Sequence, residues 1–110
     1  MATKANLVID QGSTFSTDLT LNDEDGNAID LTNFTANSQI RKWYTSTNPV
    51  ATFTTNINTT DSIVTLSLTA NQTSNLQSGR YVYDCELTSL NGAVSRIVEG
   101  IVTVTPQVTK

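Results

Sequence analysis

The sequence predicts an all-β domain, built as a sandwich of seven or eight antiparallel strands. Apolar and polar residues alternate along most of its 110 residues, as at Val64, Leu66 and Leu68, and this period of two is typical of strands with one buried face. Only 15% of the residues are charged, below the ~25% typical of soluble domains, and Thr, Asn and Ser take their place. Thr-rich sequence favours pleated, half-exposed strands over helices.

Turn residues divide the first half of the chain into short strands. Alternation predicts a strand at 7–9, which a Gln-Gly pair closes, and a second strand at 15–21. Residues 23–27 read Asp-Glu-Asp-Gly-Asn and form a turn, because these residue types tolerate positive φ. A short return segment at 29–31 then leads to a strand at 36–41.

The second half continues this pattern and holds one helix-like piece. Strands are predicted at residues 50–55, 62–69, 81–87 and 94–105. Residues 70–79 hold a helix-like piece of about one turn, and Pro106 ends the last strand. We expect a single domain over residues 1–110, with short tails at 1–6 and 107–110 outside the sandwich.

A hairpin joins the last two predicted strands. Asn91-Gly92 is a strong signal for a two-residue turn, and centring the hairpin on it fixes a register. The predicted pairs are Tyr81 with Val102, Tyr83 with Gly100, Asp84 with Glu99, Cys85 with Val98, and Glu86 with Ile97. A glycine at position 100 would leave room for the ring of Tyr83 to lie across it.

Three carboxylates are expected close together on the outward face of this hairpin. Asp84 and Glu99 lie directly opposite one another, which is unfavourable. Either a bulge near Glu99 shifts the register, or Arg80 and Arg96 neutralise the pair. With Glu86 these residues form an acidic cluster that suits a metal or an acid–base pair, but solvated strand-face charge explains it as well, and we favour that reading.

Tyr81 marks the type of sandwich. It follows Gly79 by two residues and Leu76 by five, at the corner that precedes a late strand. In sandwich proteins a Tyr placed there sends its hydroxyl back to the upstream backbone. This corner and the number of strands predict an immunoglobulin-like sandwich.

Nothing in the composition predicts catalysis. The chain has no histidine, which excludes Ser-His and Cys-His pairs, and its one cysteine, Cys85, lies on the predicted inward face. The turn at 23–27 fails as a calcium loop, because the twelfth position from Asp23 is Phe34 and not a bidentate Glu. We therefore expect a protein that is not an enzyme and binds no metal or cofactor.

The charge pattern also narrows the partners. The net charge is −4 and the longest basic run is Arg41-Lys42, so no nucleic-acid partner is expected. No apolar stretch approaches the ~18–20 residues of a membrane span, and the first six residues lack the apolar run of a secretory signal.

Trp43 and Tyr44 lie at the end of the strand that begins at residue 36, beside a polar loop at 45–49. Exposed aromatics there would suit stacking on a sugar or anchoring a protein interface. Because Trp is highly buried on average, we expect instead that Trp43 caps one end of the core.

Several motifs in order resemble those of a known group of proteins. They are Asp-Gly-Asn-Ala-Ile-Asp-Leu-Thr at 25–32, Ile-Arg-Lys at 40–42, Leu-Ser-Leu-Thr at 66–69, Gly-Arg-Tyr-Val-Tyr-Asp at 79–84, Val-Glu-Gly at 98–100 and Val-Thr-Val-Thr-Pro at 102–106. The series resembles small virion structural proteins of tailed bacteriophages, particularly marine cyanophages. It is also similar to the immunoglobulin-like N-terminal domains of phage baseplate proteins, over most of the chain.

This resemblance implies a non-catalytic protein of the phage virion, at the tail, baseplate, neck or head surface. Its partners would be other virion structural proteins, with self-association in the assembled particle. It would be made in the host cytoplasm without a signal peptide. A carbohydrate-binding module that uses Trp43 and Tyr44 is the alternative.

Overall fold

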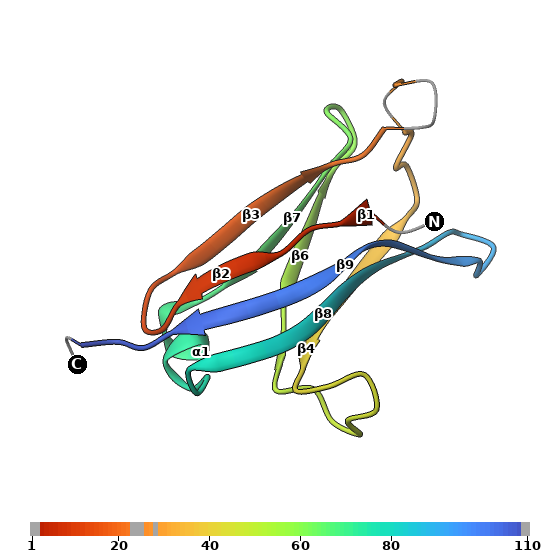
Figure 1. Ribbon diagram of the computed structural model, residues 1–110. Coiled ribbons are helices and arrows are strands. Elements are labelled where there is room, and N and C mark those ends of the chain that lie inside the picture. Colours follow the sequence, from red (N-terminus) through yellow and green to blue (C-terminus); the bar gives the residue numbers. More distant parts are fainter. Residues whose placement is uncertain (1–2, 23–25, 28, 109–110) are drawn as a thin grey trace.

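The structure is a computed structural model that describes residues 3–22, 26–27 and 29–108, and its strands form two sheets (Figure 1). In chain order the elements are β1 (Thr3–Lys4), β2 (Leu7–Asp10), β3 (Phe15–Thr20), β4 (Thr35–Arg41), β5 (Ala51–Thr52), β6 (Thr54–Asn58), β7 (Ile63–Leu68), α1 (Ala70–Ser74), β8 (Gly79–Thr88) and β9 (Val94–Thr105). The all-β class is confirmed, and α1 lies within the segment predicted to hold one helical turn. Most of the predicted turn at 23–27 lies outside the described residues.

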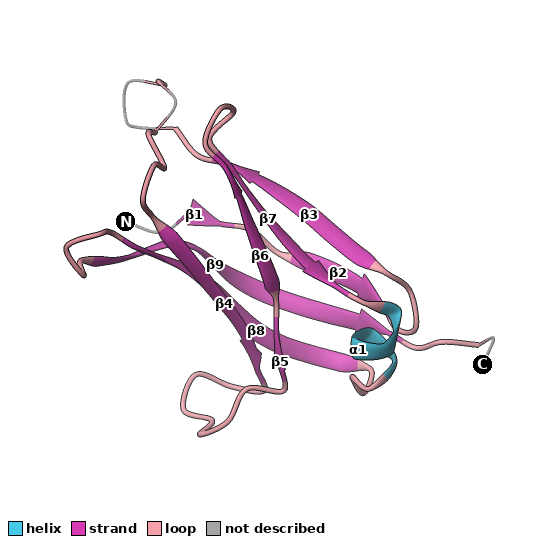
Figure 2. Cartoon of the chain, turned by 180° about the vertical axis from the view of Figure 1, so that it is seen from behind, coloured by secondary structure: helices cyan, strands magenta, loops and turns pink. Residues whose placement is uncertain are grey.

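The larger sheet has the strand order β1-β9-β8-β4-β5, with β2 also paired to β9, and the smaller sheet has the order β3-β7-β6. Figure 2 shows these two layers from behind, with α1 at one end. The chain passes from the larger sheet to the smaller at Phe53, whose N–H still donates to the Ser38 carbonyl on β4 at 2.9 Å. The strand predicted at 50–55 is therefore divided into two pieces, one in each sheet.

The core lies between the sheets. The alternation read from the sequence is confirmed where it was clearest, because Val64, Leu66 and Leu68 on β7 are all buried. The other buried apolar side chains of the cluster are Ile9, Leu21, Leu31, Ile40, Phe53, Leu76, Tyr81, Tyr83, Cys85, Leu87, Val98, Val102 and Val104. Burial of this set, at roughly 25 cal/mol per Å² of apolar surface, is the main favourable contribution to folding.

Residues 3–10 lie on the edge of β9 and not in a free tail. β1 and β2 both pair with β9 in parallel, in one continuous register that is interrupted only at Ala5 and Asn6. Two expectations need correction: the strands are not all antiparallel, and residues 3–6 are not outside the sheets. Ile9 explains the docking, since it is fully buried in the core.

The β8–β9 hairpin has the predicted register along most of its length, although its loop differs from the prediction. The loop has three residues, 90–92, because Ser89 N–H donates to Ala93 O and Gly92 N–H to Ser89 O. This offset is cancelled by a bulge at Ile97, so the predicted pairs of Tyr81, Tyr83, Asp84 and Cys85 are all observed. The predicted pair of Glu86 with Ile97 is wrong, because Glu86 pairs with Arg96.

The corner before β8 is closed by side-chain hydrogen bonds. Tyr81 Oη donates to the Gln77 carbonyl at 2.6 Å, as the spacing of the corner predicted. α1 begins with a capping box, in which Thr69 and Gln72 bond reciprocally to each other's backbone N–H. Fully buried Thr73 donates from its hydroxyl to Ser13 O and accepts from Gly12 N–H, which ties α1 to the turn between β2 and β3.

Candidate functional site

A shallow groove lies on the outer face of the larger sheet. It has a volume of about 320 Å³, at the small end of the ~300–1,000 Å³ of ligand sites. Its lining comes from β4, β8, β9 and the loop after β4, and consists of Gln39, Arg41, Tyr44, Val82, Tyr83, Asp84, Glu86, Arg96 and Glu99. Alternation explains the polar part of this set, because Gln39 and Arg41, like Asp84 and Glu86, occupy outward positions on neighbouring strands.

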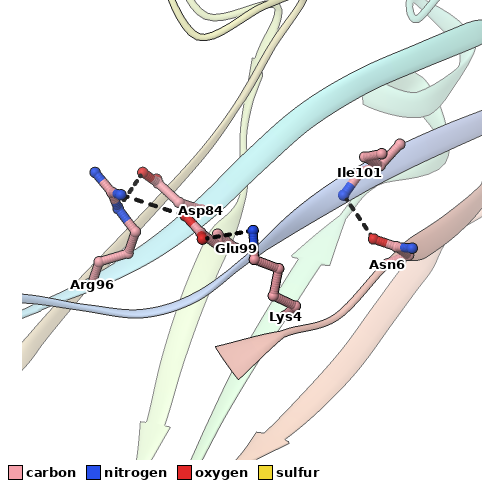
Figure 3. Close-up of polar contacts among 6 residues, drawn as sticks. All are labelled: Lys4, Asn6, Asp84, Arg96, Glu99 and Ile101. Atoms are coloured by element: carbon pink, nitrogen blue, oxygen red, sulfur yellow. Dashed lines mark hydrogen bonds and ion pairs between the residues drawn. The ribbon is translucent and has the colours of Figure 1, made fainter. Parts of the chain in front are cut away.

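Arg96 neutralises the opposed carboxylates in this groove. Its Nε lies 3.4 Å from Asp84 Oδ2 and its Nη1 lies 3.4 Å from Glu99 Oε2, and Lys4 Nζ approaches Glu99 Oε1 at 3.3 Å from β1 (Figure 3). Of the two solutions left open by the sequence, neutralisation holds, but Arg96 is joined by Lys4 and not by Arg80. The bulge lies at Ile97 and leaves Asp84 opposite Glu99. Paired carboxylates on an accessible face fit the reading as strand-face charge.

Arg41 orients the loop that carries the aromatic residues. Its Nη1 donates to Ser46 O at 2.6 Å, and its Nη2 donates to Gln39 Oε1 at 2.8 Å. Ser46 in turn closes a turn with Trp43, accepting from Trp43 N–H through Oγ and donating from its own N–H to Trp43 O. The loop is therefore fixed to the groove wall by a charged side chain.

Trp43 and Tyr44 are exposed, contrary to the expectation that Trp43 caps the core. The two residues are 59% and 65% exposed, and their ring centroids lie 5.0 Å apart in an edge-to-face arrangement. Phe53 fills the interior instead, between Phe15 and Tyr83, with ring centroids 6.0 and 6.1 Å away. One ring of this exposed pair can stack on a flat apolar surface while neighbouring groups form hydrogen bonds.

Cys85 does not line this groove. It is fully buried on the inward face, as predicted, and burial raises the pKa of its thiol to about 12, with further contributions from Asp84 and Glu86. Burial likewise raises the pKa of Tyr83 to about 12. Both groups stay protonated at neutral pH, so the thiol is a poor nucleophile.

Within the described ranges, no three acidic or cysteine side chains gather in a way that could hold a metal ion. Among the described residues the helix is α1, and its five residues are too few to cross a membrane. No model of a known protein family matches this chain, and no curated protein is similar to it. The likeness to virion proteins therefore rests on the sequence motifs and stays a prediction.

The sequence did not indicate one further group of residues, on the edge of β9. Gly100 pairs with Tyr83, as predicted, and it also lies against Ala5, since a Cβ at position 100 would clash with Ala5 O. The Tyr83 hydroxyl donates to that same carbonyl at 2.6 Å. An isolated glycine inside a strand does signal close backbone approach, but the sequence does not say which segment approaches.

Proposed function

We propose that the protein is a non-catalytic structural protein of a phage virion that assembles with other virion proteins. Its place would be the tail, baseplate, neck or head surface. The observation that supports this proposal best is the open edge of β3, which lies at the end of its sheet and pairs on one side only, with β7. Open strand edges offer unpaired N–H and C=O groups to a neighbouring chain.

The open edge of β3 has little to keep a partner away. Leu21 N–H donates to Ser62 O in the same register as the β3–β7 ladder, so the N–H groups of Ser16, Asp18 and Thr20 point to the free side. Natural edges are commonly protected by lysine, proline or a bulge. β3 has none of these, and Asp18, its one charged residue, accepts a hydrogen bond from Thr65 across the ladder.

We also propose that the sandwich is immunoglobulin-like. Three features support this: the strand order of the two sheets, the passage of the chain from one sheet to the other at Phe53, and the Tyr81 corner. Such domains recur as non-catalytic binding units, but this comparison is one of fold alone.

The test is to find the protein in purified particles and then to block the edge. Ser16→Pro removes one N–H that faces the free side and leaves the β7 ladder intact, whereas Ser16→Ala keeps that N–H. We expect the proline variant to fold but to incorporate poorly, and the alanine variant to incorporate normally. Absence of the wild-type protein from purified particles would contradict the proposal.

A carbohydrate-binding module is the second candidate, and the exposed Trp43–Tyr44 pair favours it. Tyr44 borders the groove, where Arg41 and Gln39 can donate and Asp84 can accept hydrogen bonds from hydroxyl groups. Sugars would be screened on a glycan array. Micromolar binding to one sugar, abolished by Trp43→Ala, together with absence from particles, would establish this candidate instead.

A further inference from the structure

The edge of β9 carries a site shaped for the N-terminal segment of the chain. We call it the strand-docking site, and it consists of Glu99, Gly100 and Ile101 on β9 with Tyr83 on β8. In a regular parallel ladder the Ala5 carbonyl would accept from the N–H of Ile101. Here that carbonyl accepts from the Tyr83 hydroxyl at 2.6 Å.

Asn6 replaces the missing ladder bond. Its Oδ1 accepts from Ile101 N–H at 3.0 Å, and its side chain points along the strand edge toward that group (Figure 3). Ala5 N–H keeps its regular bond to Glu99 O at 2.9 Å. The hydrogen bonds of Tyr83, Ile101 and Glu99, and the space left by Gly100, therefore match a segment in which a small residue is followed by Asn.

The rest of the segment is held by packing and charge. Ile9 is fully buried between the sheets, and Lys4 pairs with Glu99 at 3.3 Å. The segment is bounded at Gln11, whose Nε2 donates to Leu76 O and whose Oε1 accepts from Gln107 N–H. The segment that could leave β9 as a unit therefore runs from Thr3 to Asp10.

We propose that the strand-docking site also accepts residues 3–10 of a second copy, in exchange for the chain's own segment. The exchanged and closed forms would contain the same contacts, so their free energies differ only through the turn at 11–14 and the association of two chains. Copies that neighbour one another in an assembled particle would meet at a high effective concentration, which favours exchange between chains. The inference thus deepens the proposed function by naming a second copy as a partner.

Two chains with one cysteine each can detect the exchange. Val8 and Thr103 are register partners on β2 and β9, and parallel neighbours lie ~4.8 Å apart, within the range of a disulfide. One full-length chain carries Val8→Cys and the other Thr103→Cys, both with Cys85→Ala. They are mixed at high concentration in a glutathione redox buffer. The control replaces the second chain with one carrying Thr52→Cys, an exposed position on β5 at the opposite edge of the sheet.

We expect covalent heterodimers of the Val8→Cys and Thr103→Cys chains in several-fold excess over the control pair. A single chain with both substitutions should close its disulfide internally, which checks the register. Heterodimer no more abundant than in the control would overturn the proposal, and so would failure of the double variant to close. The experiment uses purified protein without particles. Strand exchange can therefore be refuted even if the protein is found in virions, and it can be observed even if the protein is absent from them.

Gly100→Ala tests which of the two chains donates the segment and which accepts it. On the Thr103→Cys chain it blocks the strand-docking site, and the heterodimer should be lost. On the Val8→Cys chain it releases that chain's own segment, and the heterodimer should increase. Equal effects from both placements would mean that the disulfides arise from random collision. If the alanine variant does not fold, the comparison with the Thr52→Cys control still decides.

Discussion

Replacing Gly100 with alanine should loosen β1 and β2 while leaving the other strands of the two sheets in place. The new Cβ would lie 2.2 Å from Ala5 O and 2.8 Å from Ala5 C, so one of the two must move. Gly100 does not have a positive φ, so the substitution has no backbone cost of its own. Any loss of stability must come from the displaced segment.

Two limits bracket the size of this effect. If the segment shifts but stays docked, the cost is that of overpacking, ~1–3 kcal/mol. If it is released at this point, the bonds to Ala5 N–H, Ala5 O and Ile101 N–H are lost, at ~1 kcal/mol each. We therefore expect the free energy of unfolding to fall by about 2–3 kcal/mol.

Urea unfolding measures the loss, and amide hydrogen exchange locates it. Exchange at Ile101 should accelerate strongly, because its N–H loses Asn6 as partner. Gly92→Ala is the matched control, since position 92 has a φ of +88° and open space around it. It should cost ~1–2 kcal/mol through its backbone alone, with exchange at Ile101 unchanged. A loss below ~0.5 kcal/mol for Gly100→Ala, within the range of ordinary surface substitutions, would refute the close contact.

Four further outcomes are expected. Tyr81→Phe should lower the free energy of unfolding by ~1 kcal/mol, because its hydroxyl bonds to Gln77 O, and an unchanged urea midpoint would mean that the hydroxyl is solvated. Native Cys85 should react with thiol reagents only as fast as the protein opens, since it is fully buried; labelling at the rate of a free peptide would show that its face is exposed. Stability should fall between about pH 9 and 12. In the unfolded state Cys85 and Tyr83 ionise with pKa values of 9.0 and 10.0, whereas burial in the fold raises both pKa values to about 12. Cys85→Ala should remove part of this fall in Tm, and a flat pH profile would argue against burial of the two groups. EDTA should leave Tm unchanged, and a drop of several degrees would reveal a bound metal ion.

Alternation carried most of the fold prediction, because it depends only on which face of a strand is buried. Val64, Leu66 and Cys85 were placed correctly for that reason. The hairpin register was also right, although its loop was not the predicted one. A three-residue loop and the bulge at Ile97 shift the pairing in opposite directions, so the inner pairs agree with a two-residue turn.

Contacts between distant segments could not be read in the same way. Gly100 was correctly paired with Tyr83, but no local signal showed that the carbonyl of Ala5, far away in the sequence, lies against the same glycine. The parallel pairing of β2 with β9 was missed for a similar reason, since no local signal specifies it. Trp43 was expected in the core from its average burial, but its loop is held outward by the bonds of Arg41.

The parallel pairing of β2 with β9 also sets how the domain would respond to force. Figure 1 shows β1 toward one end of the molecule and the C-terminal end of β9 toward the other. A pull on the two ends of the chain would drag β2 and β9 past each other in opposite directions, because the strands run the same way. The bonds of that ladder would then be loaded together in shear rather than opened one at a time. If the domain were pulled from both ends of the chain, the β2–β9 ladder would be the part that resists unfolding.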